Sequence, residues 1–271
     1  MKKVTALLLA LVMCLSLASC GGSSNSAEEQ EAPASAASDL QNVQSKGTLV
    51  VGITDFEPMD YKDENGNWIG FDADLATAFA ESLGVSVEFA EINWDNKILE
   101  LDGGSIDCIW NGMTLADEVT SAASCSNPYM RNAQVVVLPA DKAEEYADIE
   151  SLAGLTFAVE SGSAGEEAVN ELGYATTHVT AQADALMEVA AGTSDAAVID
   201  LLMAYAMVGE GTSYDNLTYT FTLNEEQYGV AFRQDSDLTD ALNAFFAAQY
   251  ADGSLGALAE QYGLAGSVIP Q

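Results

Sequence analysis

The side chains that could do chemistry are few in this chain of 271 residues. There is a single histidine, His178, and we expect it at the surface, so neither a histidine-based catalytic triad nor a multi-histidine metal site is expected. Beyond residue 46 the sequence holds only five cations, which are Lys62, Lys97, Arg131, Lys142 and Arg233. Any group that binds an anion must come from this small set or from the backbone. We expect no catalytic residue, no metal site and no cofactor.

The overall charge narrows the possible partners. The sequence has 42 acidic and 8 basic residues, a formal net charge of −34. Such a surface repels nucleic acid and anionic lipid headgroups, so we expect no nucleic-acid partner and no docking to a membrane by charge. The acidity is sufficiently explained as a solvated surface.

Two cysteines remain in the body of the chain, Cys108 and Cys125. Outside the cytoplasm two thiols can pair, but a disulfide needs a geometry that the sequence does not supply. Their spacing matches no zinc site. The sequence leaves their pairing open.

The elements that must position a site alternate along the chain. Apolar runs of strand length occur at 48–53, 86–92, 106–111 and 134–138. Stretches with helical periodicity lie between them, at 72–83 and 96–101. This order predicts an α/β fold with mostly parallel strands.

A weak internal repeat places the strand ends. Leu99-Glu100-Leu101, Gly104-Ser105 and Asp107 recur 88 residues later as Met187-Glu188-Val189, Gly192-Thr193 and Asp195. In each copy a helix ends, a glycine turn follows and an apolar strand begins. Two similar lobes would explain the repeat; common turn chemistry is the alternative. Ligands of open α/β sheets bind beyond the carboxyl ends of the strands, which here are residues 111–114 and Asp200.

The N-terminus predicts export. Lys2 and Lys3 precede an uncharged apolar run over 4–17, which is too short to span a bilayer. The run ends in Leu17-Ala18-Ser19-Cys20, which resembles the lipobox of bacterial lipoproteins. We expect residues 1–19 to be a signal peptide and Cys20 to carry lipid; a plain signal with a chance cysteine is the alternative. Residues 20–46 are small, polar and acidic, which predicts a flexible linker.

From residue 47 to about residue 264 the sequence resembles the type II periplasmic substrate-binding proteins. The likeness is to extracellular family 3, which serves ABC transporters of polar amino acids. It is carried by the segments GTLVVGITDFEPMDY (47–61), GNWIGFDADLATAFAESLG (66–84), IDCIWNGMTLADE (106–118), CSNPYMRNAQVVV (125–137), TFAVESGSAGEEAV (156–169), TSDAAVID (193–200), YGVAFRQDSDL (228–238) and DGSLGALAEQYGL (252–264). The order and spacing of these segments are more specific than any one of them.

The resemblance implies a particular architecture. Two α/β lobes are expected, with residues 47–130 and 226–271 in lobe 1 and residues 131–225 in lobe 2. Two crossing strands near 129–134 and 225–230 would join them, with the ligand cleft between the lobes. Hinge closure over the ligand would then signal loading to a permease.

The resemblance also assigns residues to the cleft. Phe56 and Trp94 are expected as walls against the apolar part of the ligand. Asn111, Gly112 and Thr114 match the strand end that holds the polar end of the ligand, although they could equally form an ordinary turn.

Lobe 2 would contribute three more residues. Ser161 and Ser163 precede a helix that begins near Glu166, whose free N–H groups favour an anion. Asp200 matches the carboxylate that pairs with the ammonium group of the ligand. Its alternative role is as the N-cap of the following helix.

Two positions depart from the family pattern. Val119 stands where the family normally has an arginine, and valine cannot form a forked pair with a carboxylate. Either the ligand lacks a free carboxylate at this position, or another cation of the protein binds it. Of the available cations, Lys97 is placed best and Arg131 is second. Glu160 stands where neutral or basic residues are common. Together with Asp200 it would make a cleft that tolerates a cationic ligand.

The sequence thus predicts a monomeric, lipid-anchored protein that captures an amino acid or a related amine or acid for an ABC permease in the membrane. An enzyme similar to the cyclohexadienyl dehydratases, with Glu160 as general acid or base, is one alternative. An extracellular ligand sensor is the other, although such sensors usually continue into a transmembrane helix and this sequence shows none.

Overall fold

The computed structural model describes residues 38–271, which contain eleven strands and nine α-helices. The strands are β1 (Thr48–Ile53), β2 (Tyr61–Lys62), β3 (Trp68–Ile69), β4 (Ser86–Glu91), β5 (Cys108–Thr114), β6 (Ser124–Cys125), β7 (Met130–Pro139), β8 (Thr156–Glu160), β9 (Ala175–Val179), β10 (Ala196–Asp200) and β11 (Leu217–Phe232). The helices are α1 (Asp39–Lys46), α2 (Phe71–Ser82), α3 (Lys97–Gly103), α4 (Asp117–Ala122), α5 (Ala164–Leu172), α6 (Gln182–Ala191), α7 (Leu201–Met207), α8 (Leu238–Asp252) and α9 (Ser254–Gln261).

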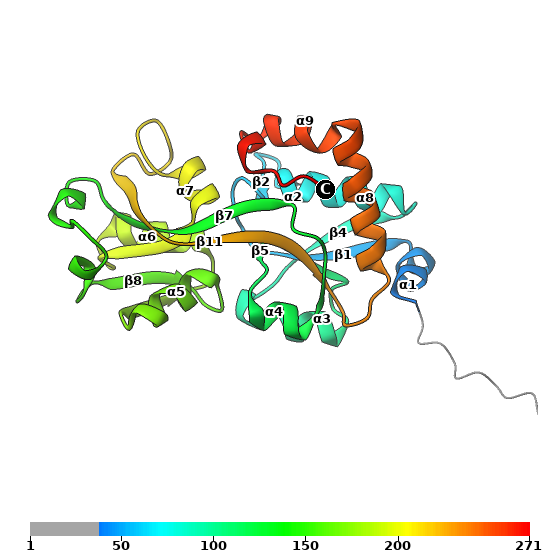
Figure 1. Cartoon of the computed structure of the whole chain (residues 1–271), viewed down its shortest axis with the longest axis horizontal. Helices are drawn as coiled ribbons and strands as arrows, with labels where there is room; N and C mark the ends of the chain where they lie inside the picture. The colour runs from blue at the N-terminus through cyan, green and yellow to red at the C-terminus, as the bar shows by residue number, and fades with distance from the viewer. Residues whose placement is uncertain (1–37) are drawn as a thin grey trace, which may run out of the picture. The chain divides into compact units, whose positions relative to one another are not determined.

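One sheet runs through the whole described chain, in the order β4-β1-β5-β11-β7-β10-β8-β9, with β6 beside β11. Strands β4 and β5 pair with β1 in parallel at one end, and β9 and β10 pair with β8 in parallel at the other. The two parallel groups are joined by antiparallel pairs through β11 and β7 (Figure 1). The two-lobed α/β fold class predicted from the sequence is confirmed.

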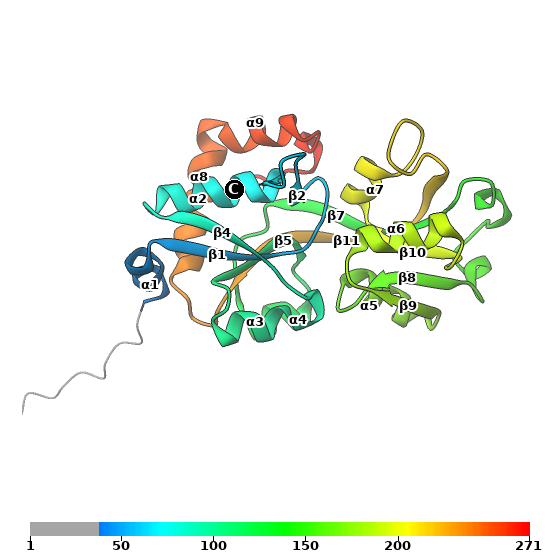
Figure 2. The same ribbon diagram turned by 180° about the vertical axis from the view of Figure 1, so that it is seen from behind.

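Helices cover both faces of each parallel group, as α/β layers require. Figure 2 shows α2 and α9 on one side of β1 and β5, with α3 and α4 on the other. In the second group α6 and α5 lie on opposite sides of β8 and β10. The crossing strands β7 and β11 pass between the groups, with Tyr228 opposite Met130 and Leu217 opposite Pro139 at the two ends of their ladder.

The internal repeat is a structural one. Gly104 and Gly192 each end a helix in the left-handed conformation, with φ of 76° and 73°. After each turn an aspartate accepts a backbone N–H of the neighbouring strand. Asp107 binds the N–H of Val50 at 2.8 Å, and Asp195 binds the N–H of Thr156 at 2.9 Å. The same turn therefore starts β5 in one lobe and β10 in the other.

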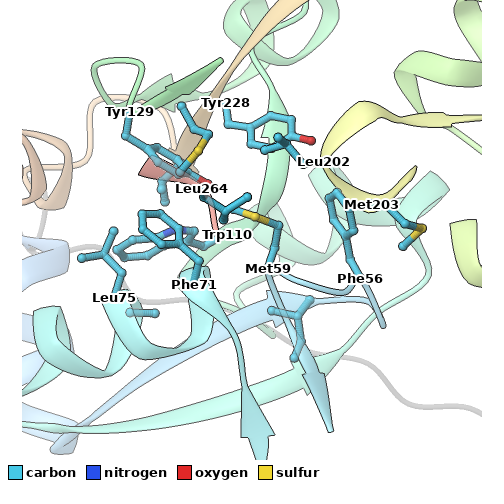
Figure 3. Packing of buried hydrophobic residues seen from close by; sticks show 14 of the residues in the cluster. Phe56, Met59, Phe71, Leu75, Trp110, Tyr129, Leu202, Met203, Tyr228 and Leu264 are labelled. Carbon is cyan, nitrogen blue, oxygen red and sulfur yellow. The ribbon is translucent and has the colours of Figure 1, made fainter. Parts of the chain in front are cut away.

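The apolar core of the first lobe lies beneath α2. Phe71, Trp110 and Tyr129 gather there, and the rings of Phe71 and Tyr129 stack with centroids 6.2 Å apart (Figure 3). Inside this cluster Asp72 is fully buried, and both of its carboxylate oxygens accept the hydroxyl of Tyr129, at 2.8 and 2.7 Å. The core thus fixes the start of α2 against the chain that enters β7.

The predicted flexible linker is wrong for its last eight residues, which form α1. Ser38 caps this helix by accepting the N–H of Gln41, and Gly47 ends it with φ of 75°. Val43 is completely buried, and Asp39 forms an ion pair with Arg233 at 3.1 Å. Composition concealed this helix because its apolar contacts are few, the buried Val43 and the partly buried Leu40. The predicted signal peptide, lipidated Cys20 and first part of the linker lie outside the described residues.

Two further observations bear on predictions from the sequence. Cys108 and Cys125 are both free, so the question of their pairing is answered in favour of thiols. None of the helices within residues 38–271 combines the length and apolar character needed to cross a bilayer.

We predict that Val43→Ala lowers the free energy of unfolding by about 1–3 kcal/mol, because it removes two buried methyl groups from the contact that docks α1. Gln44→Ala, at an exposed position of the same helix, is the control and is expected to change stability by less than about 0.5 kcal/mol. Urea unfolding of both variants checks this. Equal stabilities would mean that α1 is not docked in solution.

Candidate functional site

A cavity of about 570 Å³ lies where the two parallel groups of strands face each other. Its wall draws on the loop after β1, the ends of β5, β8 and β10, and helices α3, α4, α5 and α6. The lining residues are Phe56, Trp94, Asp95, Lys97, Asn111, Gly112, Met113, Thr114, Ala116, Glu118, Val119, Glu160, Gly162, Ser163, Ala164, Glu166, Glu167, Asn170, Glu171, Gln182 and Asp200. Both lobes therefore contribute to one hollow, at the strand ends that the sequence predicted.

The end of β5 is already bonded within the protein. The side-chain amide of Asn111 donates to Asp60 at 2.7 Å and to the carbonyl of Thr54 at 3.1 Å, and its oxygen accepts the N–H and the hydroxyl of Thr54. The N–H of Gly112 donates to Asp72 at 2.7 Å. Both residues line the cavity, but their donors are occupied by carboxylates of the first lobe.

Gly112 also makes room for an aromatic wall. Its φ is 53°, and a Cβ atom at this position would lie 2.3 Å from Cε1 of Phe56. Phe56 is 3% exposed and meets Tyr228 edge to face. Trp94, Met113 and the buried Val119 extend the apolar surface. The walls predicted at Phe56 and Trp94 are thus part of the cavity.

Lys97 bridges the lobes. Its ammonium donates to the carbonyl of Gly162 at 2.8 Å and to the carbonyl of Trp94 at 3.4 Å, and it lies 5.2 Å from the centre of the Trp94 ring. Burial lowers the pKa of Lys97, while the charges of Glu118 and Glu160 oppose that shift. The amine is therefore bonded to the protein and surrounded by carboxylates.

The start of α5 is capped by its own residues. The hydroxyl of Ser163 accepts the N–H of Glu166 at 3.1 Å, and the Glu166 carboxylate accepts the N–H of Gly162 at 2.7 Å. Ser161 gives its N–H to the carbonyl of Val179 and does not line the cavity. The anion position that the resemblance implied at this helix start is filled by an internal carboxylate.

Glu160 is the most unusual group in the wall. It is 2% exposed, and its Oε1 atom is buried without a hydrogen-bond partner. Burial and the neighbouring charge of Asp200 raise the pKa of Glu160 to about 8, although Lys97 acts in the opposite direction. The raised pKa favours the protonated form of this carboxyl near neutral pH.

Asp200 ends β10 and reaches the crossing strands. Its carboxylate accepts the side-chain amides of Asn132, Gln134 and Gln182, and the hydroxyl of Tyr228 at 2.6 Å. Burial first, and then the charge of Glu226, raise the pKa of Asp200 well above its ordinary value. It makes no side-chain cap for α7. This carboxylate belongs to the cavity and to the hinge at once.

The prediction and the structure differ in two further ways: a second predicted residue lies outside the cavity, and several lining residues were not predicted. Arg131 is exposed, donates to the carbonyl of Val268 at 3.3 Å, and lines a different hollow beside the crossing strands. The sequence reasoning missed Gln182, whose amide holds both the carboxylate and the N–H of Asp200. It also missed Glu118 as a lining residue. A glutamine that starts a helix carries no signal of this kind, because its partner is 18 residues away.

Residues 49–265 match the family model of the bacterial extracellular solute-binding proteins, family 3. The chain belongs to this family. The matched range spans both lobes and both crossing strands.

Known members are similar over nearly the whole solute-binding protein. The arginine-binding extracellular protein ArtP of Bacillus subtilis (strain 168) is 29% identical over 249 residues, which are 90% of this chain and 91% of that protein. The crystal structure of the P235GK mutant of ArgBP from T. maritima has a TM-score of 0.78 and 33% identity, covering 83% of this chain and 98% of that one.

One relative is an enzyme. The cyclohexadienyl dehydratase of Pseudomonas aeruginosa is 28% identical to this solute-binding protein over 133 residues, 48% of this chain and 50% of that protein. The likeness to ArtP and ArgBP covers a larger share of the chain.

We predict that the ligand-free solute-binding protein loses stability as the pH rises from about 5 to 8. Burial raises the pKa of Glu160 to about 8 and the pKa of Asp72 to about 7. Over this pH range the folded protein therefore keeps protons that the unfolded chain has already released. Their contribution is complete below the ordinary carboxyl pKa and is lost as the pH rises through 7 and 8. Glu160→Gln should flatten this fall in urea unfolding series.

Glu171→Gln provides the matched control, because Glu171 lines the same cavity but is exposed. It should leave the slope of stability against pH unchanged. If Glu160→Gln and Glu171→Gln behave alike, the Glu160 carboxyl does not keep its proton in the folded protein.

Proposed function

We propose that this protein is the extracytoplasmic solute-binding component of an ABC importer, and that it captures an amino acid or an amino-acid-like ligand by lobe closure. Residues 47–130 with 226–271 would move as one lobe, and residues 131–225 as the other. It acts as a monomer, and its partner is a permease in the membrane.

The observation that carries this proposal is a cavity shared by two lobes that only two long strands connect. A ligand in such a cavity touches both lobes, so its binding free energy favours the closed arrangement. The Lys97 ammonium already contacts Gly162 across the cavity. Family membership and the names of the relatives support an amino-acid-like ligand.

The first experiment is a thermal-shift screen with the proteinogenic amino acids, their decarboxylated amines and small dipeptides. Binding to the native state alone raises the melting temperature by mass action. Small-angle scattering with and without the best ligand then measures closure. A ligand that binds without making the protein more compact would contradict the closure mechanism.

We predict that Asp200→Ala weakens binding of that ligand at least tenfold, since truncating one member of a desolvated charge pair costs about 2–5 kcal/mol. Asp215→Ala, at an exposed position outside the cavity wall, is the control. Asp200→Asn keeps the shape of the site if Asp200→Ala proves unstable. Titration calorimetry checks all three, and an unchanged dissociation constant in both Asp200 variants would remove Asp200 from the site.

We further propose that the lipid on Cys20 anchors the protein to the cell membrane. Cys20→Ser should release the protein from the membrane fraction, as detected by fractionation and immunoblotting. Cys14→Ser is the matched control, because Cys14 lies in the predicted signal peptide and should leave the anchoring intact. Retention of Cys20→Ser in the membrane fraction would contradict the anchor.

An enzymatic role has one observation in its favour, the buried Glu160 with its pKa of about 8, a value suited to a general acid at neutral pH. The test is turnover of prephenate or arogenate by the purified protein. We expect none, because the proposed mechanism consists of binding and closure. Turnover that Glu160→Gln abolishes would establish the enzyme instead.

A further inference from the structure

Three N–H donors of the cavity wall are already used within the protein. The N–H of Gly112 is given to Asp72, and the N–H of Gly162 is given to Glu166, both at 2.7 Å. The amide of Asn111 is given to Asp60, also at 2.7 Å. In each case the acceptor is a carboxylate of the protein itself. An incoming carboxylate would have to break one of these hydrogen bonds to gain one, so it would gain little.

The charges in the cavity wall also disfavour a carboxylate on the ligand. Among the described residues that line the cavity, seven carry a carboxyl group and one, Lys97, carries an amino group. The Lys97 ammonium donates to two backbone carbonyls, and Glu118 and Glu160 lie near it. Its charge is therefore balanced within the protein. The carboxylate of a ligand would meet like charges in a low-dielectric site, which costs several kcal/mol.

Among the residues that line the cavity, one buried acceptor has no hydrogen-bond partner. Glu160 is 2% exposed and lines the cavity, and its Oε1 atom has no hydrogen bond. Buried polar atoms are nearly always paired, and an unpaired one costs about 1–3 kcal/mol. An N–H donor on a ligand would satisfy this oxygen. This observation is independent of the count of charges, and it places the donor at the end of β8.

The remaining wall suits the body of a small apolar group. Phe56, Trp94, Met113 and Val119 are all buried and all line the cavity. Val119 offers methyl groups where a cation would be needed to hold a carboxylate. The cavity thus combines an apolar surface with an acceptor at its base.

We propose that the cavity takes an organic cation without a free carboxylate, an amine or a guanidine with a short apolar body, and that Glu160 accepts its N–H groups. This inference rests on the proposed function, because it names the ligand class of the same capture site. A zwitterionic amino acid is the less favourable ligand, because its carboxylate would enter a cavity rich in hydrogen-bond acceptors.

Titration calorimetry on the purified protein tests the ligand class with matched pairs that differ only in the carboxylate. The pairs are arginine and agmatine, lysine and cadaverine, and histidine and histamine. We expect at least one amine to bind at least tenfold more tightly than its amino acid. If amino acids bind and every amine is weaker, the inference fails while the proposed function stands. If no compound of either series binds, the inference fails and the proposed function loses its ligand.

Variants of the wall test the role of Glu160. Glu160→Gln should weaken binding of the preferred amine at least tenfold, whereas Glu210→Gln, which removes an exposed carboxyl outside the cavity wall, should change it less than threefold. Equal losses, or no loss in Glu160→Gln, would overturn the assignment. Val119→Arg is a test by gain of function. It should bring the affinity for the amino acid of the pair at least to that for the amine, and an unchanged preference would count against the inference.

The dependence of binding on pH gives a third readout. Glu160 must release its proton to accept a cation, so affinity for the amine should rise with pH up to about 8, by up to about tenfold per unit. The groups that act on Glu160 are Asp200 from β10, Lys97 from α3, Asp184 from α6 and Thr54 after β1. Glu160→Gln should abolish this rise. A rise that persists in the variant would assign it to another group.

Discussion

The antiparallel pairing of β7 with β11 is the contact on which the rest of the structure depends. Within the described part of the chain, β11 pairs with β5 of one parallel group and β7 pairs with β10 of the other, so their shared ladder links the two groups. Each group has its own helices and could pack its own core. Without the ladder from Met130–Tyr228 to Pro139–Leu217, however, the strand ends of the two groups would not face each other. The cavity exists because two short parallel sheets share one long antiparallel joint.

The site and the joint use the same buried polar groups. Asp200 comes from the second lobe, but Asn132, Gln134 and Tyr228, which donate to it, come from the crossing strands. Because buried hydrogen bonds in a low-dielectric network strengthen one another, a change at one member is felt by the others. A ligand that takes a bond from Asp200 alters the bonding of both strands at the point where they cross. Under the proposed function, this network would couple ligand binding to the position of the crossing strands.

Short-range patterns predicted the α/β fold class, whereas the family resemblance supplied the crossing strands and much of the cavity wall. The strand at 48–53 and the repeated turns at Gly104 and Gly192 could be read from periodicity and turn chemistry. The position of α1 could not, since it is held by contacts distant in the sequence, such as the ion pairs Asp39–Arg233 and Lys46–Asp107. Likewise the resemblance placed Asn111 and Ser163 in the wall, but not the internal carboxylates that take their neighbours' donors. Those bonds join residues 40 to 51 positions apart or lie within one helix start, and no local pattern predicts them.

This internal use of carboxylates changes what the acidity of the chain means. A net charge of −34 is explained by a solvated surface only for the exposed residues. Asp60, Asp72, Glu160 and Asp200 are buried, and burial raises the pKa of each. Asp72 and Asp200 accept hydrogen bonds from the protein, whereas Asp60 and Glu160 each keep one buried oxygen unpaired. Of these four residues, only Glu160 combines an unpaired oxygen with a place in the cavity wall, and the proposed organic cation would use this combination.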